Sequence, residues 1–205
     1  PLTVIYDNNK IGIWQQADVD NGALKKQTSP VQLPGEIRVE DVDNNGVIDA
    51  NDRKIIGNFQ PKWEGGLTNR ISFKGFDVSF VTFARMGMKV VVPYLSGTSG
   101  GGSGFGFLNQ GRSNQLVMDY WTPENPTNAF PRPDAGGGVR NFTSTTSYQD
   151  GSFIKMRSIN VGYTVSAKAL NKIGVSSARI YLNATNPFII YSPLVKAGLA
   201  VDPEG

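Results

Sequence analysis

The stretch Leu67-Thr-Asn-Arg-Ile-Ser-Phe-Lys-Gly-Phe-Asp-Val-Ser-Phe-Val-Thr-Phe-Ala-Arg85 alternates between apolar and polar residues on both sides of a Lys74-Gly75 pair. Successive side chains of a strand point to opposite faces, so a period of two gives a strand one apolar face. The Lys-Gly pair suits a tight turn because glycine readily adopts positive φ. The stretch therefore predicts an antiparallel hairpin with one apolar and one polar face.

Such a hairpin fits a soluble β-sandwich or meander, whose strands alternate in the same way, or the wall of a transmembrane β-barrel. Trp63 and Phe73 lie ten residues apart, and Phe153 and Tyr163 repeat that spacing. Ten strand residues tilted by about 40° cover roughly 25 Å, the height of the apolar band of an outer-membrane barrel. The irregular region over residues 90–152 suits the long outward loops of such a barrel. These features favour the barrel.

The remaining elements are shorter. Residues 159–165 and 179–185 alternate and predict two further strands, the second ended by Asn186-Pro187 because proline donates no ladder hydrogen bond. Helical turns are expected over three segments: 50–56 before Gly57, 114–120, and 166–173 before Gly174.

A second informative stretch is Asp41-Val-Asp-Asn-Asn-Gly-Val-Ile-Asp-Ala-Asn-Asp52. Short oxygen-bearing side chains alternate around Gly46, which matches the spacing of the twelve-residue EF-hand loop. Ile48 supplies the apolar residue that packs such a loop on a core. Ca²⁺ requires six to eight oxygen ligands. The spacing predicts a site for Ca²⁺, or failing that Mg²⁺ or a water, with these ligands: Asp41, Asp43, Asn45, the Val47 carbonyl, Asp49 and Asp52.

The loop departs from the EF-hand pattern at its last position. Asp52 replaces a long bidentate glutamate and reaches about one methylene less far, so the expected affinity lies at the weak end of about 10⁻⁴ to 10⁻³ M. A solvated turn is the alternative, because Asp, Asn and Gly are common turn residues.

Composition excludes several classes of function. The chain has 205 residues, a net charge of only +3 and neither cysteine nor histidine. It therefore shows no basic signature of nucleic-acid binding, and thiol redox chemistry, Cys/His zinc sites and histidine acid–base catalysis are excluded. No apolar run approaches the ~20 residues of a membrane-spanning helix. The glycine-serine run over residues 96–106 lacks the Gly-Lys-Ser/Thr ending of a phosphate-binding loop.

Several motifs, in order along the chain, resemble the SusC/RagA family of TonB-dependent outer-membrane transporters. Pro34-Gly-Glu-Ile37 leads into the acidic stretch, and Arg53 and Ile56-Gly57 follow it. The other matching motifs are Gly65-Gly-Leu-Thr-Asn69, Lys74-Gly-Phe-Asp77, Tyr120-Trp-Thr-Pro-Glu-Asn-Pro126, Gly151-Ser-Phe-Ile-Lys155, Arg157-Ser-Ile-Asn160, Ala184-Thr-Asn-Pro-Phe188 and Asp202-Pro-Glu204.

The resemblance implies that residues 1–205 are the C-terminal part of a 22-stranded barrel, with no counterpart of the plug domain. Residues 36–57 would be a calcium-loop-like insert within an extracellular loop. The resemblance further implies an importer of glycans or peptides in the outer membrane of a Gram-negative bacterium of the Bacteroidetes type. Its partners would be a SusD-like surface lipoprotein, membrane lipid, and the TonB complex through parts outside this sequence.

The sequence thus predicts an all-β fold: about four antiparallel strands of a transmembrane β-barrel, long extracellular loops and an EF-hand-like acidic loop. A non-enzymatic part of a nutrient importer is the expected function. Two alternatives are a soluble extracellular calcium-binding β-domain, acting in adhesion or carbohydrate binding, and a glycosidase. The glycosidase is disfavoured because, outside the acidic stretch, the carboxylates are scattered on turns.

The barrel interpretation makes two geometric predictions. The Lys74-Gly75 turn and residues 166–177 should lie at one end of the strands, the periplasmic end, with the acidic loop and residues 90–152 at the other. The polar alternates should face the lumen (Thr68, Arg70, Ser72, Asn160 and Asn183). The chain should not form a closed domain by itself, because bacterial barrels close with at least eight strands.

Overall fold

A computed structural model describes residues 3–92, 95, 119–132, 141–166, 170, 174–199 and 202 of the chain. The chain divides into two compact units. Unit 1 comprises residues 1–60, 89–150 and 197–201, and unit 2 comprises residues 61–88, 151–196 and 202–205. Within the described ranges, none of the helices is long and apolar enough to cross a membrane.

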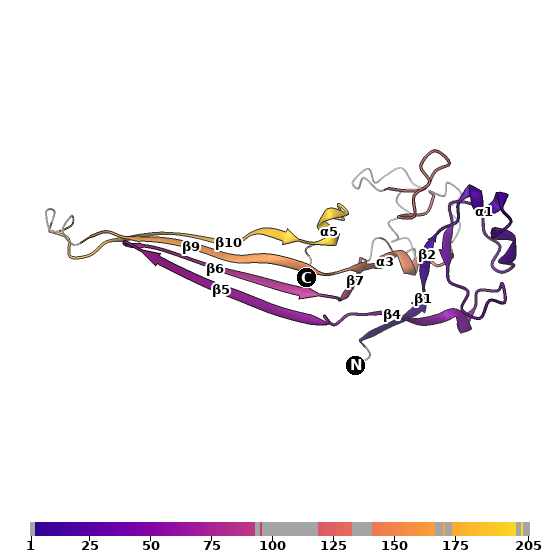
Figure 1. Ribbon diagram of the computed structural model, residues 1–205, viewed down its shortest axis with the longest axis horizontal. Coiled ribbons are helices and arrows are strands. Elements are labelled where there is room, and N and C mark those ends of the chain that lie inside the picture. Colours follow the sequence, from indigo (N-terminus) through magenta and orange to yellow (C-terminus); the bar gives the residue numbers. More distant parts are fainter. Residues whose placement is uncertain are drawn as a thin grey trace. The chain divides into compact units, whose positions relative to one another are not determined.

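Unit 2 is built on one antiparallel sheet of four long strands (Figure 1). The strands are β5 (Trp63–Phe73), β6 (Phe76–Met86), β9 (Phe153–Thr164) and β10 (Arg179–Tyr191), in the order β10-β9-β6-β5. Lys74 and Gly75 connect β5 to β6 with φ values of 47° and 87°. Two consecutive positive φ values are the geometry of a type I′ hairpin turn, so the predicted hairpin is confirmed.

The register of the sheet places the predicted apolar residues on one face. Ile71 lies opposite Val78, Val78 opposite Val161, and Val161 opposite Leu182, so one cross-strand row runs through all four strands. Directly paired residues of antiparallel strands point to the same side of a sheet. The row is therefore apolar throughout. The intervening residues form the opposite face, which is mainly polar but also carries Val81, Phe83 and Tyr181.

Strand β10 does not end where the sequence predicts. It continues through Asn186 and Pro187 to Tyr191, with a register shift between Thr185 and Phe188 and a φ of 48° at Asn186. A bulge in an edge strand accommodates a proline because its missing N–H is not needed for the ladder there. The predicted break is therefore a bulge.

The described residues of unit 1 form three small two-stranded antiparallel sheets. Strand β1 (Val4–Asn8) pairs with β4 (Arg53–Asn58), and β2 (Lys10–Ile13) pairs with β3 (Ile37–Val39). Strand β7 (Lys89–Val91) pairs with β8 (Tyr148–Asp150), so the ends of the predicted long loop are paired.

The helices of the described chain are short. They are α1 (Gln16–Asp20), η1 (Leu24–Lys26), η2 (Ala50–Asp52) and α3 (Ser144–Ser147) in unit 1, and α5 (Pro193–Lys196) in unit 2. The helical prediction for residues 50–56 was wrong beyond residue 52, because residues 53–58 pair with β1 as a strand. A buried apolar cluster forms the core of unit 1: Ile13, Ile37, Val39, Ile48 and Trp121.

Several sequence predictions fall on parts of the chain outside the described residues. They include the glycine-serine run over 96–106 and most of the helix predicted for 114–120, although Tyr120 itself forms a bridge with Phe130. The helix predicted for 166–173 is described only at Ser166 and Leu170.

Candidate functional site

The apolar face of the unit 2 sheet is exposed along all four strands. Leu67, near the middle of β5, exposes 60% of its surface, Ile71 exposes 62%, and Leu182 on β10 exposes 70%. The same face carries other large exposed side chains: Trp63, Phe73, Phe76, Val161 and Ile180. A contiguous apolar surface of this kind marks contact with another apolar phase or partner.

The length of the strands and the positions of the aromatic side chains fit a lipid-spanning band. β5 and β6 have 11 residues each, and a tilted transmembrane strand needs about 9–11. Trp63 and Phe73 are the first and last residues of β5, and the Phe73 end also carries the Phe76 and Tyr163 rings, whose centroids lie 4.4 Å apart. Aromatic side chains therefore bracket the aliphatic band at both ends.

The second predicted aromatic pair does not fit the band. Tyr163 lies on the apolar face, opposite Phe76, but Phe153 is 0% exposed and lies opposite Arg85 on the polar face. The register shifts between Val81, opposite Ser158, and Thr82, opposite Met156, so β9 has a bulge at Arg157 and its alternation reverses there. Counting ten residues in sequence ignored this bulge, so the expectation for Phe153 was wrong.

The opposite face of the sheet carries charges and amides. Arg85 donates to Glu64 at 3.1 Å, and Arg179 donates to Asp77 at 2.7 Å. Asn183 donates to Asn160, which donates to Ser79 at 3.4 Å. The residues predicted to face a lumen all lie on this face: Thr68, Arg70, Ser72, Asn160 and Asn183.

The ends of the sheet are distinct. The Lys74-Gly75 turn and the connection between β9 and β10 lie at the same end, where Thr164 donates its N–H to the Gly75 carbonyl at 2.8 Å. Their predicted proximity is confirmed. Pro61, Met88 and Gly151 are boundary residues of unit 2. In sequence they lie within two residues of the start of β5, the end of β6 and the start of β9, which are the ends of these strands away from the Lys74-Gly75 turn.

The acidic loop of unit 1 has part of the predicted geometry. Gly46 has a φ of +80°, and Ile48 is buried in the core cluster, as the sequence predicts. Asp41, Asp43 and Asp52 each offer a carboxylate oxygen within 4.8 Å of the others. Three hard oxygen donors this close fit a Ca²⁺ ion in charge and chemistry.

The other predicted ligands are arranged differently. Asp49 is not part of this carboxylate group, because it caps the turn η2 and accepts the Asn51 N–H at 2.7 Å. Asn45 accepts the N–H of Val47 at 2.6 Å, and Val47 forms a bridge with Ser29. The structure therefore brings together three of the six predicted ligands as a carboxylate group.

Asp52 also has a structural role. Its side chain is fully buried and accepts the N–H groups of Val42 at 2.7 Å and of Asp49 at 2.8 Å. The second bond completes a capping box with Asp49. The short carboxylate thus holds both ends of the loop, which also explains why a glutamate is not needed at this position.

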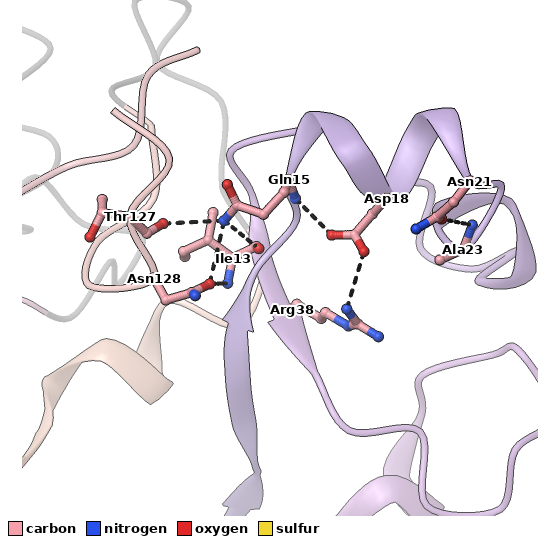
Figure 2. A network of polar contacts seen from close by, with 8 residues as sticks. All are labelled: Ile13, Gln15, Asp18, Asn21, Ala23, Arg38, Thr127 and Asn128. Atoms are coloured by element: carbon pink, nitrogen blue, oxygen red, sulfur yellow. Dashed lines mark hydrogen bonds and ion pairs between the residues drawn. The ribbon is translucent and has the colours of Figure 1, made fainter. Parts of the chain in front are cut away.

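A polar network that the sequence did not predict connects β2 to residues 127–128 (Figure 2). Gln15 accepts the indole N–H of Trp121 at 2.7 Å, and its amide nitrogen donates to the carbonyls of Ile13 and Thr127. Asn128 accepts the Ile13 N–H at 2.9 Å. Trp121, Thr127 and Asn128 each lie more than 100 residues from their partner in this network, and no local pattern in the sequence marks these contacts.

Comparison with known proteins gives consistent relatives, although no family model matches the chain. The chain is 28% identical over 199 residues to TonB-dependent receptor P26 of Formosa agariphila and 27% identical over 205 residues to TonB-dependent receptor SusC of Bacteroides thetaiotaomicron. These alignments cover 95% and 97% of this chain but 18% of each relative. The chain thus spans about a fifth of the length of the curated relatives it matches.

The fold matches solved structures of the same kind. The RagAB peptide importer in its open-open state aligns with a TM-score of 0.57 and 16% identity, covering 92% of this chain and 19% of that chain. The RagAB peptide transporter aligns with a TM-score of 0.56 and 18% identity. These sequence relatives are TonB-dependent receptors, SusC among them, and the RagAB importer shares the fold, so the resemblance to the SusC/RagA family is confirmed.

Proposed function

We propose that this chain forms part of the barrel wall of a TonB-dependent importer in the outer membrane of a Gram-negative bacterium of the Bacteroidetes type. The observation that carries the proposal is the exposed apolar face of the unit 2 sheet, bracketed by aromatic side chains. In water such a face is unfavourable at about 25 cal/mol for each Å² of apolar surface, whereas lipid removes that cost. The polar face would then line the lumen.

The relatives support a proposal for the cargo and the partners. SusC and the RagAB peptide importer support a nutrient importer rather than an enzyme. We infer that the whole receptor imports glycans or peptides, works with a SusD-like surface lipoprotein, and is energised by the TonB complex through parts outside this chain. A deletion strain tested for growth on a single polysaccharide or on peptides as carbon source would distinguish the two cargo classes.

Cysteine labelling tests the membrane assignment, because the chain contains no cysteine of its own. Leu67→Cys and Thr68→Cys are matched variants on adjacent residues of opposite faces. In the whole receptor, with no other accessible thiol, a membrane-impermeant maleimide should label Cys at 68 and spare Cys at 67. A bilayer-confined paramagnetic quencher should affect a probe at 67 alone. Equal aqueous labelling at both positions would contradict the proposal and favour a soluble calcium-binding β-domain.

We further propose that the acidic loop binds Ca²⁺ through Asp41, Asp43 and Asp52. The three adjacent carboxylates and the buried Ile48 support this. When Ca²⁺ binds, rotation of the Asn45 and Asp49 side chains and the Val47 carbonyl would supply further oxygens. The ion would stabilise the loop.

Calorimetry on the whole receptor tests the calcium proposal. Asp43→Asn should weaken Ca²⁺ binding about tenfold or more, since a charge-assisted ligand is lost. Asp20→Asn, at an acidic residue of α1 outside the loop, is the control and should leave the affinity unchanged. Heat of binding that is the same in the wild type and in Asp43→Asn would place the ion elsewhere.

A further inference from the structure

Unit 1 contains a cleft of about 380 Å³ between β2, β7, β8 and the segment around Asn128. Two ammonium groups line it, from Lys10 of β2 and Lys89 of β7. None of the lining residues is acidic. Within the described chain, neither lysine forms an ion pair, and the residues that line the cleft carry a net positive charge.

Asp150 lies opposite Lys89 in the register of β7 and β8 but does not line the cleft, and two further carboxylates of unit 1 have other partners. Asp7 accepts the hydroxyl groups of Ser144 at 2.8 Å and of Tyr148 at 3.1 Å. Glu40 is bound by Lys54 at 2.5 Å and by the Asn9 amide at 2.6 Å. Because both carboxylates already have partners, the lysines of the cleft are available to an external anion.

The remaining donors of the cleft are aligned by the fold. Asn128 accepts the backbone N–H of Ile13, which fixes the orientation of its amide and leaves its nitrogen to donate (Figure 2). Gly12 makes room for this amide, since a Cβ there would lie 2.8 Å from the Asn128 oxygen. The ammonium of Lys10 is held by the Ala129 carbonyl and lies 6.0 Å from the centre of the Phe130 ring.

The second lysine is also positioned. A Cβ on Gly57 of β4 would lie 2.7 Å from Cγ of Lys89. The methylene chain of Lys89 therefore lies against β4 at a residue that has no side chain. Gly57 is thus a positioning residue for the Lys89 ammonium. Two cations and one amide N–H group from separate elements therefore offer charged and neutral hydrogen-bond donors to the cleft. That is the pattern of an anion site rather than of a site for a neutral sugar.

We propose that this cleft binds the carboxylate of a small ligand through Lys10 and Lys89, with Asn128 as a neutral donor. The carboxylate accepts hydrogen bonds from both ammonium groups, and the rest of the ligand lies against Phe130. The volume accommodates a unit the size of a sugar acid or a dipeptide. This binding does not depend on the transport function proposed above, because the cleft lies wholly within unit 1.

Two pairs of probes on the purified whole receptor in detergent test the proposal by calorimetry. Glucuronate is compared with glucose, and diglycine is compared with its C-terminal amide. The carboxylate member of a pair should bind and its neutral counterpart should not. Binding of glucuronate alone assigns the carboxylate to a sugar acid, diglycine alone to a peptide, and both to recognition of the carboxylate itself. Failure of both acids to bind, or equal binding of a neutral counterpart, would overturn the proposal.

Variants locate the site. Lys10→Gln and Lys89→Gln should each weaken the acid about tenfold or more, and together they should abolish measurable binding. Lys25→Gln, which removes an exposed lysine outside the cleft, is the charge-matched control and should have no effect. Gly57→Ala retains every charge but displaces Lys89, so it should weaken binding without a change in overall melting. Wild-type affinity in Lys10→Gln and Lys89→Gln would place the anion elsewhere and refute the assignment.

Discussion

Large apolar residues are buried in the core of unit 1 but exposed on the sheet of unit 2. In unit 1, Ile37 exposes 2% of its surface and packs with Trp121 in a conventional core. In unit 2, Ile71 exposes 62% of its surface and Trp63 exposes 57%. Both units are built from antiparallel strands, so the difference does not lie in the backbone. It indicates that the two units have different surroundings. Unit 1 is surrounded by water, whereas the apolar face of the unit 2 sheet contacts an apolar phase.

The polar groups are separated in the same way. In unit 2 the ion pairs, such as Arg179–Asp77, lie on one face of the sheet, opposite the apolar row. In unit 1 the polar contacts connect short segments, as Gln15 does between Trp121 and Thr127. A sheet with a hydrophobic outside requires a polar inside, whereas a water-facing unit requires its polar side chains at turns and surfaces.

The largest expected effect is in the core of unit 1. Ile37→Ala should reduce the stability of this unit by about 2–5 kcal/mol, because it removes buried methyl groups and leaves a cavity. Hydrogen exchange of peptides over residues 37–39 in the whole receptor would measure the change. Leu67→Ala on the sheet is the comparison and should cost less, because lipid fills the vacated space. An equal loss at the two sites would show that Leu67 also packs inside protein.

An arginine placed on either face of the unit 2 sheet tests whether only one face contacts an apolar phase. Leu67→Arg should cost about 2–4 kcal/mol and impair assembly of the receptor, because arginine at the middle of the lipid face is poorly solvated. Thr68→Arg, one residue along β5 and on the polar face, should assemble normally. Heat-modifiable migration of the receptor from outer-membrane fractions would report assembly. Normal assembly of Leu67→Arg would mean that water reaches this face.

The sheet was predictable from sequence because its pattern is local. The alternation from Leu67 to Arg85 determines the strands, the turn and both faces within a single stretch. The bulge at Arg157 was not predictable, since it depends on how β9 aligns with β6 and not on a turn residue. The reversal of Phe153 follows from that bulge.

The candidate sites were predictable to different degrees. Three ligands of the acidic loop lie together because all are within one twelve-residue stretch. The lysine cleft gave no signal, because Lys10 and Lys89 come together only when separate small sheets pack. The helix α1 was missed for a similar reason: its five residues are stabilised by a capping box and by Arg38, which pairs with Asp18 at 3.5 Å.

The pH dependence of carboxylate binding should distinguish a partly desolvated lysine from an exposed one. Burial lowers the pKa of Lys10 from 10.5 to about 8, so its ammonium is charged below that pH and neutral above it. Glucuronate affinity should therefore fall about tenfold between pH 7 and pH 9. In Lys10→Arg this fall should disappear, because arginine stays protonated. An unchanged pH profile in Lys10→Arg would exclude Lys10 as the titrating group.

The other charged groups around Lys10 do not reverse this sign. Burial, with the nearby Asp7 carboxylate, raises the pKa of Tyr148, so the phenol stays neutral through the range. The hydrogen bond from Lys54 lowers the pKa of Glu40, so that carboxylate stays ionised. Lys89 also faces the cleft and contributes charge of the same sign. The double variant Lys10→Arg with Lys89→Gln therefore tests whether any pH dependence comes from Lys89.

The smallest expected effect concerns Gln32, a polar residue buried in unit 1. Gln32 is 4% exposed, and within the described chain neither its amide nitrogen nor its amide oxygen has a hydrogen-bond partner. A buried amide without partners is destabilising, whereas an apolar side chain of similar length fills the same space without that penalty. Gln32→Met should therefore stabilise unit 1 by about 1 kcal/mol.

Protection from hydrogen exchange in peptides covering residues 30–35 of the whole receptor would measure this gain. Gln60→Met is the matched control at an exposed glutamine of the same unit and should change nothing. A loss of protection in Gln32→Met would show that the amide is bound to water or to a partner of the assembled receptor. In that case the interior of unit 1 would be polar around Gln32. The contrast between a buried apolar core in unit 1 and an exposed apolar face in unit 2 would then apply only to the cluster around Ile37 and Trp121.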